Sequence, residues 1–394
     1  MPQPNWIVTV GMAKEGAGTW GTAVTPPTIW LSSSAPVFTE KQVAVFDKGL
    51  RGIRSATQAM TFGAAHTEID IPGMPWYGDD SGNLLMSMMG ADALTGTAKN
   101  GTITALAPGG TTATYTVGAG GASATGDVFK IDAGLPTQEI IIPTSVAANV
   151  WTIPATGVGS AKFNHAGGAT AVSLFTHTIS MLNTGQPPSY TVAKYDALNT
   201  TNARQIAGVY FEQVDIKFAS SAGLTIDAKG RGKLGTNVAK ATATYSTEPF
   251  NVPWQSAFTI AGVANARVVD FTISIKAAND QIFGMNATQS PTAAISDQLT
   301  VTGTFTIVPD DYTEFTYYLQ NTQPVVSILL DNGSTQTIFQ MSKCALIDPV
   351  TFAHSGNYST LTATYEAISN STDAGATGNA PFKAILRNGK SAAY

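Results

Sequence analysis

Apolar and polar residues alternate strictly in several stretches of this chain. Residues 268–276, VVDFTISIK, place Phe271, Ile273 and Ile275 on one face and their polar neighbours on the other. The same alternation recurs at 210–218, 223–232 and 298–307. A period of two is typical of a β-strand with one face in a core and a polar face in water or at a wet interface. The pattern therefore predicts an all-β protein with a few short helices.

Two stretches depart from this pattern and predict helices, at 78–91 (GDDSGNLLMSMMGA) and 308–321 (VPDDYTEFTYYLQN). Each opens on an Asp-Asp pair. Asp is favoured at helix N-caps and in first turns, because its carboxylate accepts from free amides and faces the positive end of the helix dipole. We interpret the pairs as helix caps rather than as catalytic carboxylates: Asp79, Asp80, Asp310 and Asp311. The expected buried stripes are Leu84, Leu85, Met88 and Met89, and then Phe315, Tyr318 and Leu319.

The order of these segments occurs twice. Residues 28–80 can be laid over 258–311, and the strands that follow each helix also correspond. Such repetition indicates an internal duplication. The copies keep register only if 94–172 is an insertion, whose short strands and Gly-rich turns suit a small β-barrel or sandwich. The predicted organisation is a first unit at 1–93 plus 173–250, an inserted domain at 94–172 and a second unit at 251–394.

Composition narrows the range of functions. Only 12% of the 394 residues are charged and the formal net charge is −5. This gives no reason to expect a duplex-DNA binder, since neutralising phosphates needs a basic surface. The single cysteine, Cys344, excludes an intrachain disulfide framework and suits assembly in a reducing cytosol. The N-terminal residues carry no signal-peptide pattern, and the apolar runs are too short to cross a bilayer.

No motif in the sequence points to catalysis, a cofactor or a metal. It contains no Gly-x-Ser-x-Gly, His-Glu-x-x-His, Walker or Cys-x-x-Cys pattern. The glycine-rich stretch 16–23 lacks the lysine-serine pair of a phosphate loop, and the four histidines share no ligand spacing. We interpret the basic cluster 229–233, KGRGK, as a solvated turn at a strand end in preference to a nucleic-acid contact. The sequence therefore predicts no enzyme activity and no cofactor.

Five segments follow one another in a fixed order: GTWGTAVTPPTIWLSS, a long loop containing KGLRGIR, the helix DDSGNLLMSMMGA, then FTHTISMLNTGQPPSYTVAKYD and GVYFEQVDIKFASSAGLTIDAKGRGK. This order resembles that of the tail tube (major tail) proteins of long-tailed bacteriophages. The resemblance covers most of the chain outside the insertion. The insertion is similar to small β-barrel modules of phage structural proteins.

The resemblance implies packed β-sheets flanked by a helix, in a structural virion protein that self-assembles into stacked rings. Such rings form the tail tube, the conduit for DNA ejection. Three or six chains per ring are both compatible with a duplicated chain. The implied partners are the chain itself, a tape measure protein, a tail terminator and viral DNA in transit, with no membrane. The implied location is the virion tail, after assembly in the host cytoplasm. The alternative is a β-rich surface binding module, carbohydrate-binding or adhesin-like.

Two kinds of assembly surface follow from the resemblance. Stretches 41–61 and 277–296 are expected to be long, irregular loops that reach the neighbouring ring. The inter-ring residues are Asp47, Lys48, Leu50, Arg51 and Arg54. The polar strand faces are candidates for the channel wall, although alternation leaves open which face lines it. The candidates are Asp215, Asp227, Asp270, Thr225, Thr272, Thr300 and Thr302, partly offset by Lys217, Lys229 and Lys276. We expect the insertion on the outer surface.

Overall fold

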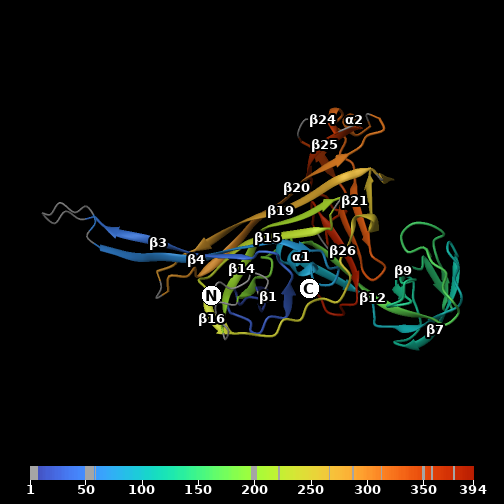
Figure 1. Ribbon diagram of the computed structural model, residues 1–394, viewed down its shortest axis with the longest axis horizontal. Coiled ribbons are helices and arrows are strands. Elements are labelled where there is room, and N and C mark those ends of the chain that lie inside the picture. Colours follow the sequence, from blue (N-terminus) through green and yellow to red (C-terminus); the bar gives the residue numbers. More distant parts are fainter. Residues whose placement is uncertain are drawn as a thin grey trace.

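The structure is a computed structural model that describes residues 8–48, 57, 59–196, 202–220, 222–265, 267–285, 288–311, 313–347, 351–355, 358–375 and 378–394. Over these residues the all-β prediction is confirmed, because large antiparallel sheets dominate the chain. The α-helices within them are α1 (Gly82–Met89) and α2 (Thr313–Leu319). A long hairpin extends from one end of the body, and a small module lies beyond the other end (Figure 1).

Sheet I joins strands from both halves of the chain, and its neighbouring strands all pair antiparallel. From one edge to the other the strands are β3 (Val37–Asp47), β4 (Ala59–Pro75), β15 (Thr225–Gly232), β14 (Asn202–Ala219), β19 (Val268–Ile282), β20 (Ala293–Ile307) and β25 (Tyr358–Ala367). Two short strands, β23 (Cys344–Leu346) and β24 (Thr351–Ser355), follow the outer side of β25. The first part of β14 also pairs with β13 (Tyr190–Tyr195) and β16 (Thr236–Ala239), and beyond β13 come β1 (Thr9–Lys14) and β2 (Ile29–Leu31).

Sheet II covers one face of sheet I. Its strands in order are β5 (Gly90–Thr95), β12 (Ala169–Met181), β26 (Lys383–Asn388), β22 (Gln336–Met341), β21 (Val326–Asp331), β17 (Ser256–Ile260) and β18 (Val263–Ala264). Strand β12 comes from the first half of the chain and β26 from the second, so this sheet also crosses from one half to the other.

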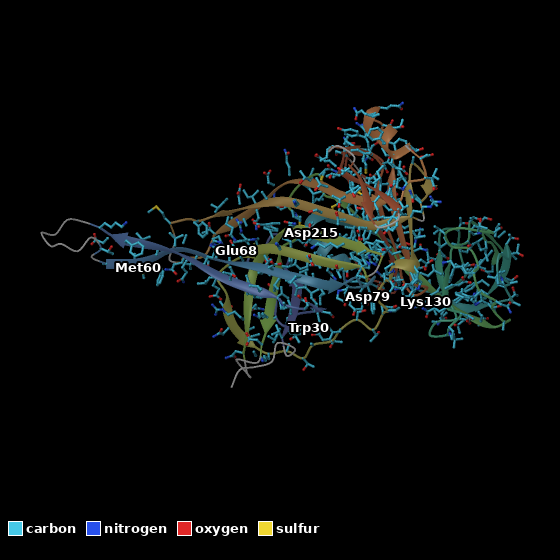
Figure 2. The ribbon with its side chains drawn as sticks, turned by 45° about the horizontal axis from the view of Figure 1, so that its top comes forward. Trp30, Met60, Glu68, Asp79, Lys130 and Asp215 are labelled. Carbon is cyan, nitrogen blue, oxygen red and sulfur yellow. The ribbon has the colours of Figure 1, made fainter. Side chains whose placement is uncertain are left out.

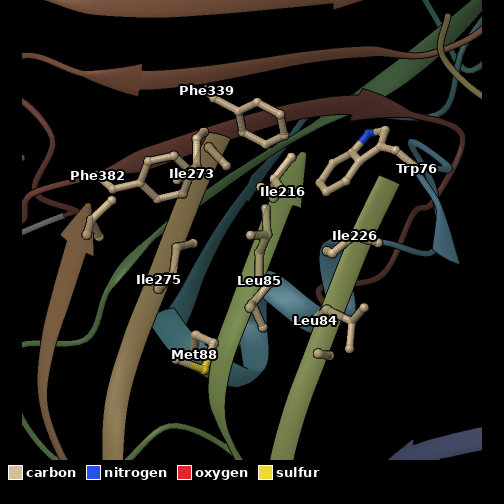
Figure 3. Close-up of a cluster of buried hydrophobic side chains, with 14 of the residues drawn as sticks. Trp76, Leu84, Leu85, Met88, Ile216, Ile226, Ile273, Ile275, Phe339 and Phe382 are labelled. Atoms are coloured by element: carbon tan, nitrogen blue, oxygen red, sulfur yellow. The ribbon is translucent and has the colours of Figure 1, made fainter. Parts of the chain in front are cut away.

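The main core lies between the two sheets. Ile216, Ile226 and Ile273 project from sheet I toward Phe339 of sheet II and toward α1 (Figure 3). All residues of α1 are buried, because the helix contacts β14 and β19 on one side and β5 and β12 on the other. Trp76 packs edge-on against Phe339, with ring centroids 5.0 Å apart. One continuous core therefore serves both halves of the chain.

The inserted segment has a hydrophobic core of its own. Its strands are β6 (Asn100–Ile103), β7 (Thr112–Ala119), β8 (Val128–Ile131), β9 (Glu139–Ile141), β10 (Ser145–Ala147) and β11 (Val150–Thr152), and the start of β12 completes it. Trp151 stacks on Phe129 at 4.6 Å between ring centroids. His165 is buried between two carboxylates, with Nδ1 2.7 Å from Asp132 and Nε2 2.6 Å from Glu139. This polar cluster fixes a loop of the module onto its strands.

The capping role expected for Asp79 and Asp80 is wrong. Helix α1 begins at Gly82, and its N-cap residue, Ser81, makes no side-chain capping hydrogen bond. The Asp79 carboxylate instead accepts the Ser246 hydroxyl at 2.7 and 2.8 Å. Burial, and then the neighbouring Asp79, raise the pKa of Asp80 to about 6, while Lys390 opposes the shift. The pair therefore belongs to a tertiary contact between the helix and the segment that links the two halves.

The second Asp pair divides into two roles. The Asp311 carboxylate accepts the Thr313 amide at 2.8 Å, at the start of α2, and hydrogen bonds from Thr313 lower the pKa of Asp311. Asp310 forms an ion pair with Arg267. The apolar stripe of α1 is buried as expected, but Leu319 of α2 is 66% exposed. Helix α2 therefore lies on the surface.

More than half of the described residues in the two stretches expected to be irregular loops are strand, whereas residues 49–56, 58, 286 and 287 lie outside the described residues. Residues 41–47 belong to β3 and 59–61 to β4, while 277–282 and 293–296 belong to β19 and β20. Each hairpin contains a β-bulge, between Gln42 and Ala44 in one and between Ala277 and Asn279 in the other. A bulge adds one residue and shifts the alternation to the other face. This shift hides the period-two pattern from sequence reasoning.

Candidate functional surfaces

The uncovered face of sheet I is polar and brings together every residue predicted for the channel wall. The register places Asp227 opposite Asp215, Asp215 opposite Ser274, and Ser274 opposite Thr302. Because residues two apart in a strand share a face, the remaining candidates lie beside this row. They are Thr225, Asp270, Thr272 and Thr300, with Lys217, Lys229 and Lys276 among them. Figure 2 labels Asp215 and Glu68 on this sheet.

Most charges on this polar face are engaged by neighbours on the same face. Asp215 accepts the Gln213 amide at 2.6 Å and the Ser274 hydroxyl. Asp227 accepts the Gly73 amide at 2.7 Å and an ion-paired hydrogen bond from Lys217, which raises the pKa of that lysine. Pairing of this kind engages Lys217, and Lys229 lies 3.7 Å from Asp70, so two of the three candidate lysines have an acid beside them.

Threonines form the other half of the polar face. The hydroxyls of Thr272 and Thr304 lie 3.0 Å apart, and those of Thr306 and Thr362 lie 3.1 Å apart. The two hydroxyls of each pair satisfy each other's hydrogen bonding within the sheet. Because the side chains are short, they leave the surface even. The result is an even, neutral strip of short side chains between the acidic residues.

Sequence reasoning missed several charged residues of this face. Glu68 and Asp70 of β4 alternate with the buried Ile69 and Ile71, so the period-two pattern did signal them. Arg231 lies 3.2 Å from Glu212 and 3.9 Å from Glu68. The cluster KGRGK is thus mainly strand rather than turn, because Lys229 and Arg231 lie within β15 between two paired neighbours.

The strands of sheet I follow one order twice. In the first half the order is β3, β4, β15, β14, and in the second it is β19, β20, β25 and then β23 with β24. The two runs meet where β14 pairs with β19, from Gln213 opposite Lys276 to Ala219 opposite Asp270. Within the described residues, β3 pairs only with β4, and β23 and β24 pair only with β25. Both outer edges of the sheet are therefore open.

The β3–β4 hairpin carries the predicted inter-ring residues as far as the structure describes them. Asp47 ends β3 and Lys48 is exposed just after it, whereas Leu50, Arg51 and Arg54 lie outside the described residues. The described part of the hairpin exposes an unusual number of apolar side chains, namely Val37, Val43, Val45, Phe46, Met60 and Phe62. The β19–β20 hairpin beside it exposes Ile282, Phe283, Met285 and Ile295.

Other chemistry is sparse in the part of the chain that the structure describes. A search of these residues finds no cluster of His, Cys, Asp and Glu suited to a metal ion. Cys344 is buried, and burial raises the pKa of its thiol to about 12. Among the same residues, no helix has the length and apolarity needed to cross a membrane.

An all-β chain with a polar sheet face and open edges is typical of a structural subunit that assembles through its strands. A model of the family described as phage tail tube protein matches residues 6–382, nearly the whole chain. The chain therefore belongs to the phage tail tube protein family. No curated protein matches it. The family makes this a structural protein of the virion tail that associates with copies of itself.

Proposed function

We propose that three chains close into a ring, that rings stack into the tail tube, and that the polar face of sheet I lines the channel through which DNA is ejected. Assembly takes place in the host cytoplasm. The other partners are a tape measure protein and a tail terminator. The two runs of sheet I, together with the strands and helix around each, represent duplicated units.

The observation that carries this proposal is the β14–β19 junction. It joins the last strand of one run to the first strand of the next, within one chain. The two open edges of sheet I have the same composition as this junction. One edge is β3, the first strand of the first run, and the other is β23 with β24, the last strands of the second run. The same junction can therefore form between chains, with β24 of one chain beside β3 of the next. Pairing of this kind covers every open edge.

The strand count favours three chains. Counting β3, β4, β15, β14, β19, β20, β25 and β24, each chain supplies eight strands, so three chains supply 24. At about 4.8 Å between strands and a tilt of about 40°, the barrel diameter is roughly 50 Å between backbones. Side chains narrow this to a channel that a single duplex passes. Six chains give roughly twice that width.

The polar face is assigned to the channel because the opposite face of sheet I is already covered by sheet II and α1. Closing the sheet leaves one face inward, and this face holds self-paired acids, lysines and threonines. DNA must pass without being held, and each phosphate that binds a free cation adds salt-dependent affinity. A lining with few free cations meets that requirement.

The test is a cryo-electron microscopy reconstruction of tubes assembled from purified protein, with native mass measurement of single rings. We expect three chains per ring, β24 beside β3 at the chain boundary, and Asp215 and Asp227 facing the channel. Six chains per ring, or a channel lined by sheet II, would overturn the proposal. If the protein stays monomeric under every condition, the alternative function, a β-rich surface binding module, would be favoured instead.

A further inference from the structure

The outer part of the β3–β4 hairpin carries an apolar patch that the described residues of its own chain leave about half exposed. Phe46 lies opposite Met60 and Ala44 opposite Phe62, so these side chains share one face of the hairpin. Phe46, Met60 and Phe62 are 49%, 51% and 49% exposed. Figure 2 shows Met60 on the extended hairpin, away from the body. We call Phe46, Met60 and Phe62 the arm patch; clusters of this kind mark interaction surfaces.

An apolar cleft of 380 Å³ lies at the other end of sheet I. Its walls come from the end of β14, the start of β19, strands β17 and β21, and the 3-10 helix η2 (Pro253–Gln255). Phe258 and Phe271 pack edge-to-face within it, 5.2 Å between centroids. Trp254 stands at the wall with 82% of its surface exposed. We call this the Trp254 cleft.

The arm patch cannot reach the Trp254 cleft of its own chain. Met60 lies at the start of β4, whereas Pro75 at its end pairs with Thr225, beside the end of β14 that forms the cleft. Met60 and Pro75 are 15 positions apart along the extended strand, or about 50 Å at 3.3 Å per residue. Two complementary surfaces at opposite ends of one molecule join copies head to tail, and such contacts propagate into filaments.

Acids predominate beside the Trp254 cleft. The neighbouring hollow shares Ala264 and Asn265 with the Trp254 cleft and is lined by Asp310, Asp311 and Glu314 against one cation, Arg267. The ion pair with Arg267 engages Asp310, leaving the other acids in excess. On the arm, Asp47 and the exposed Lys48 follow Phe46 of the arm patch. Docking with Lys48 rather than Asp47 toward these acids makes the contact favourable.

We infer that the arm patch of a chain in one ring docks in the Trp254 cleft of a chain in the next ring. The inference rests on the proposed tube and names the receptor for its inter-ring contact. The occupant of the cleft is a second copy of this chain. Trp254 acts as the central anchor, because a large aromatic side chain at an apolar cleft supplies much of the energy of a typical interface.

Two variants separate the partners of this contact. The arm variant carries Phe46→Asp and Met60→Asp, and the cleft variant carries Trp254→Asp. The matched control carries Val117→Asp and Val150→Asp, which change exposed apolar residues of the inserted module. Rings of each protein are assembled separately and then examined by electron microscopy and analytical ultracentrifugation, alone and mixed. All the substituted side chains are exposed, so we expect each variant to fold, which circular dichroism checks.

We expect each variant alone to give single rings and no tubes, and the control to give normal tubes. Arm-variant rings keep an intact cleft and cleft-variant rings keep an intact arm. Their mixture should therefore form one contact only, giving double rings and nothing longer. Normal tubes from either variant, loss of the rings themselves, or a mixture that stays as single rings would overturn the inference. Failure of the unaltered protein to form tubes would instead count against the proposed function.

Discussion

At the scale of single residues, the acids of the polar face carry the first prediction. Replacing Asp215, Asp227 and Asp270 with lysine raises the net charge by six per chain, two at each site. If these residues line the channel, tubes should still form, while DNA delivery slows and the tubes retain DNA at low salt, because free cations bind phosphates. Filter binding of labelled DNA to purified tubes across a salt series measures the retention.

Asparagine at the same three positions is the matched control. It keeps an acceptor for the Ser274 hydroxyl and for the Gly73 amide, which bond to Asp215 and Asp227. The asparagine protein should assemble and should hold less DNA than the lysine protein. If the lysine tubes deliver and retain DNA as the unaltered tubes do, these residues lie elsewhere and another face lines the channel.

A second prediction concerns Asp80. Its pKa in the folded protein is about 6, against an ordinary 3.8, because burial disfavours the charged form. The folded state therefore binds this proton more tightly, and lowering the pH through 6 favours folding at this site. Above pH 6 the charge opposes folding, so Asp80→Asn should stabilise the protein by about 1–2 kcal/mol at pH 7.5. The gain should shrink toward pH 5 in urea unfolding curves.

Asp79→Ala is the comparison for that experiment. It removes the acceptor of the Ser246 hydroxyl and should destabilise the fold at both pH values, by about 1 kcal/mol. A gain from Asp80→Asn that is equally large at pH 5 and pH 7.5 would mean that burial of the charge is not its cause.

The sequence predicts the role of a residue where that role depends on its near neighbours in the chain. Alternation found Asp215 and Asp227 because every second residue of a strand shares a face. It could not show that they lie opposite each other, since register between strands is set by the whole sheet. The role of Asp79 was misread for the same reason, because its partner Ser246 lies 167 residues away.

At the scale of elements, the end of the β3–β4 hairpin carries the third prediction. Deleting residues 47–54 removes the last residue of β3 and leaves its pairing with β4 from Val37 to Phe46. The protein should remain folded and should form rings but no long tubes, as measured by circular dichroism and electron microscopy. Replacing the same residues by an equally long Gly/Ser linker tests whether length alone suffices. Normal tubes from the deleted protein would remove this segment from ring stacking.

Elements were easiest to read where the alternation is unbroken. Strands β19 and β20 were visible over 268–276 and 298–307, and the apolar stripe of α1 marked a buried helix. The hairpin ends were not, because bulges and apolar residues on both faces remove the polar half of the pattern. We propose that the exposed apolar residues of the hairpins contact other chains, and no pattern within one chain records such a contact.

At the scale of the whole molecule, the sequence showed the repeated order of segments, but it did not show that the two halves share their sheets. Sequence suggested two separate units, whereas sheets I and II both run from one half of the chain to the other through β14–β19 and β12–β26. Such long-range pairing has no local signature in the sequence. The β14–β19 junction within one chain also shows the kind of strand pairing that we propose between chains.

The inserted module carries the last prediction. It is joined to β12 of sheet II and lies beyond the end of the body opposite the β3–β4 hairpin (Figure 1). Sheet II covers the face of sheet I opposite the polar one, so we expect a channel at the polar face to leave the module outside.

Its contacts with the body are mainly polar, with Lys162 2.8 Å from Asp331 and Lys130 3.3 Å from Ser334. Excising residues 97–172 and bridging the ends with a short linker therefore exposes little apolar surface apart from Leu174, which is changed to serine. Because Thr95 and Thr176 are paired neighbours, a short linker spans the gap.

We expect the shortened protein to form rings and tubes of normal channel width and a smaller outer diameter in electron micrographs. The Leu174→Ser change in the full chain is the control. Density for the module inside the channel of unaltered tubes would contradict the prediction, as would loss of assembly in the shortened protein while the control assembles.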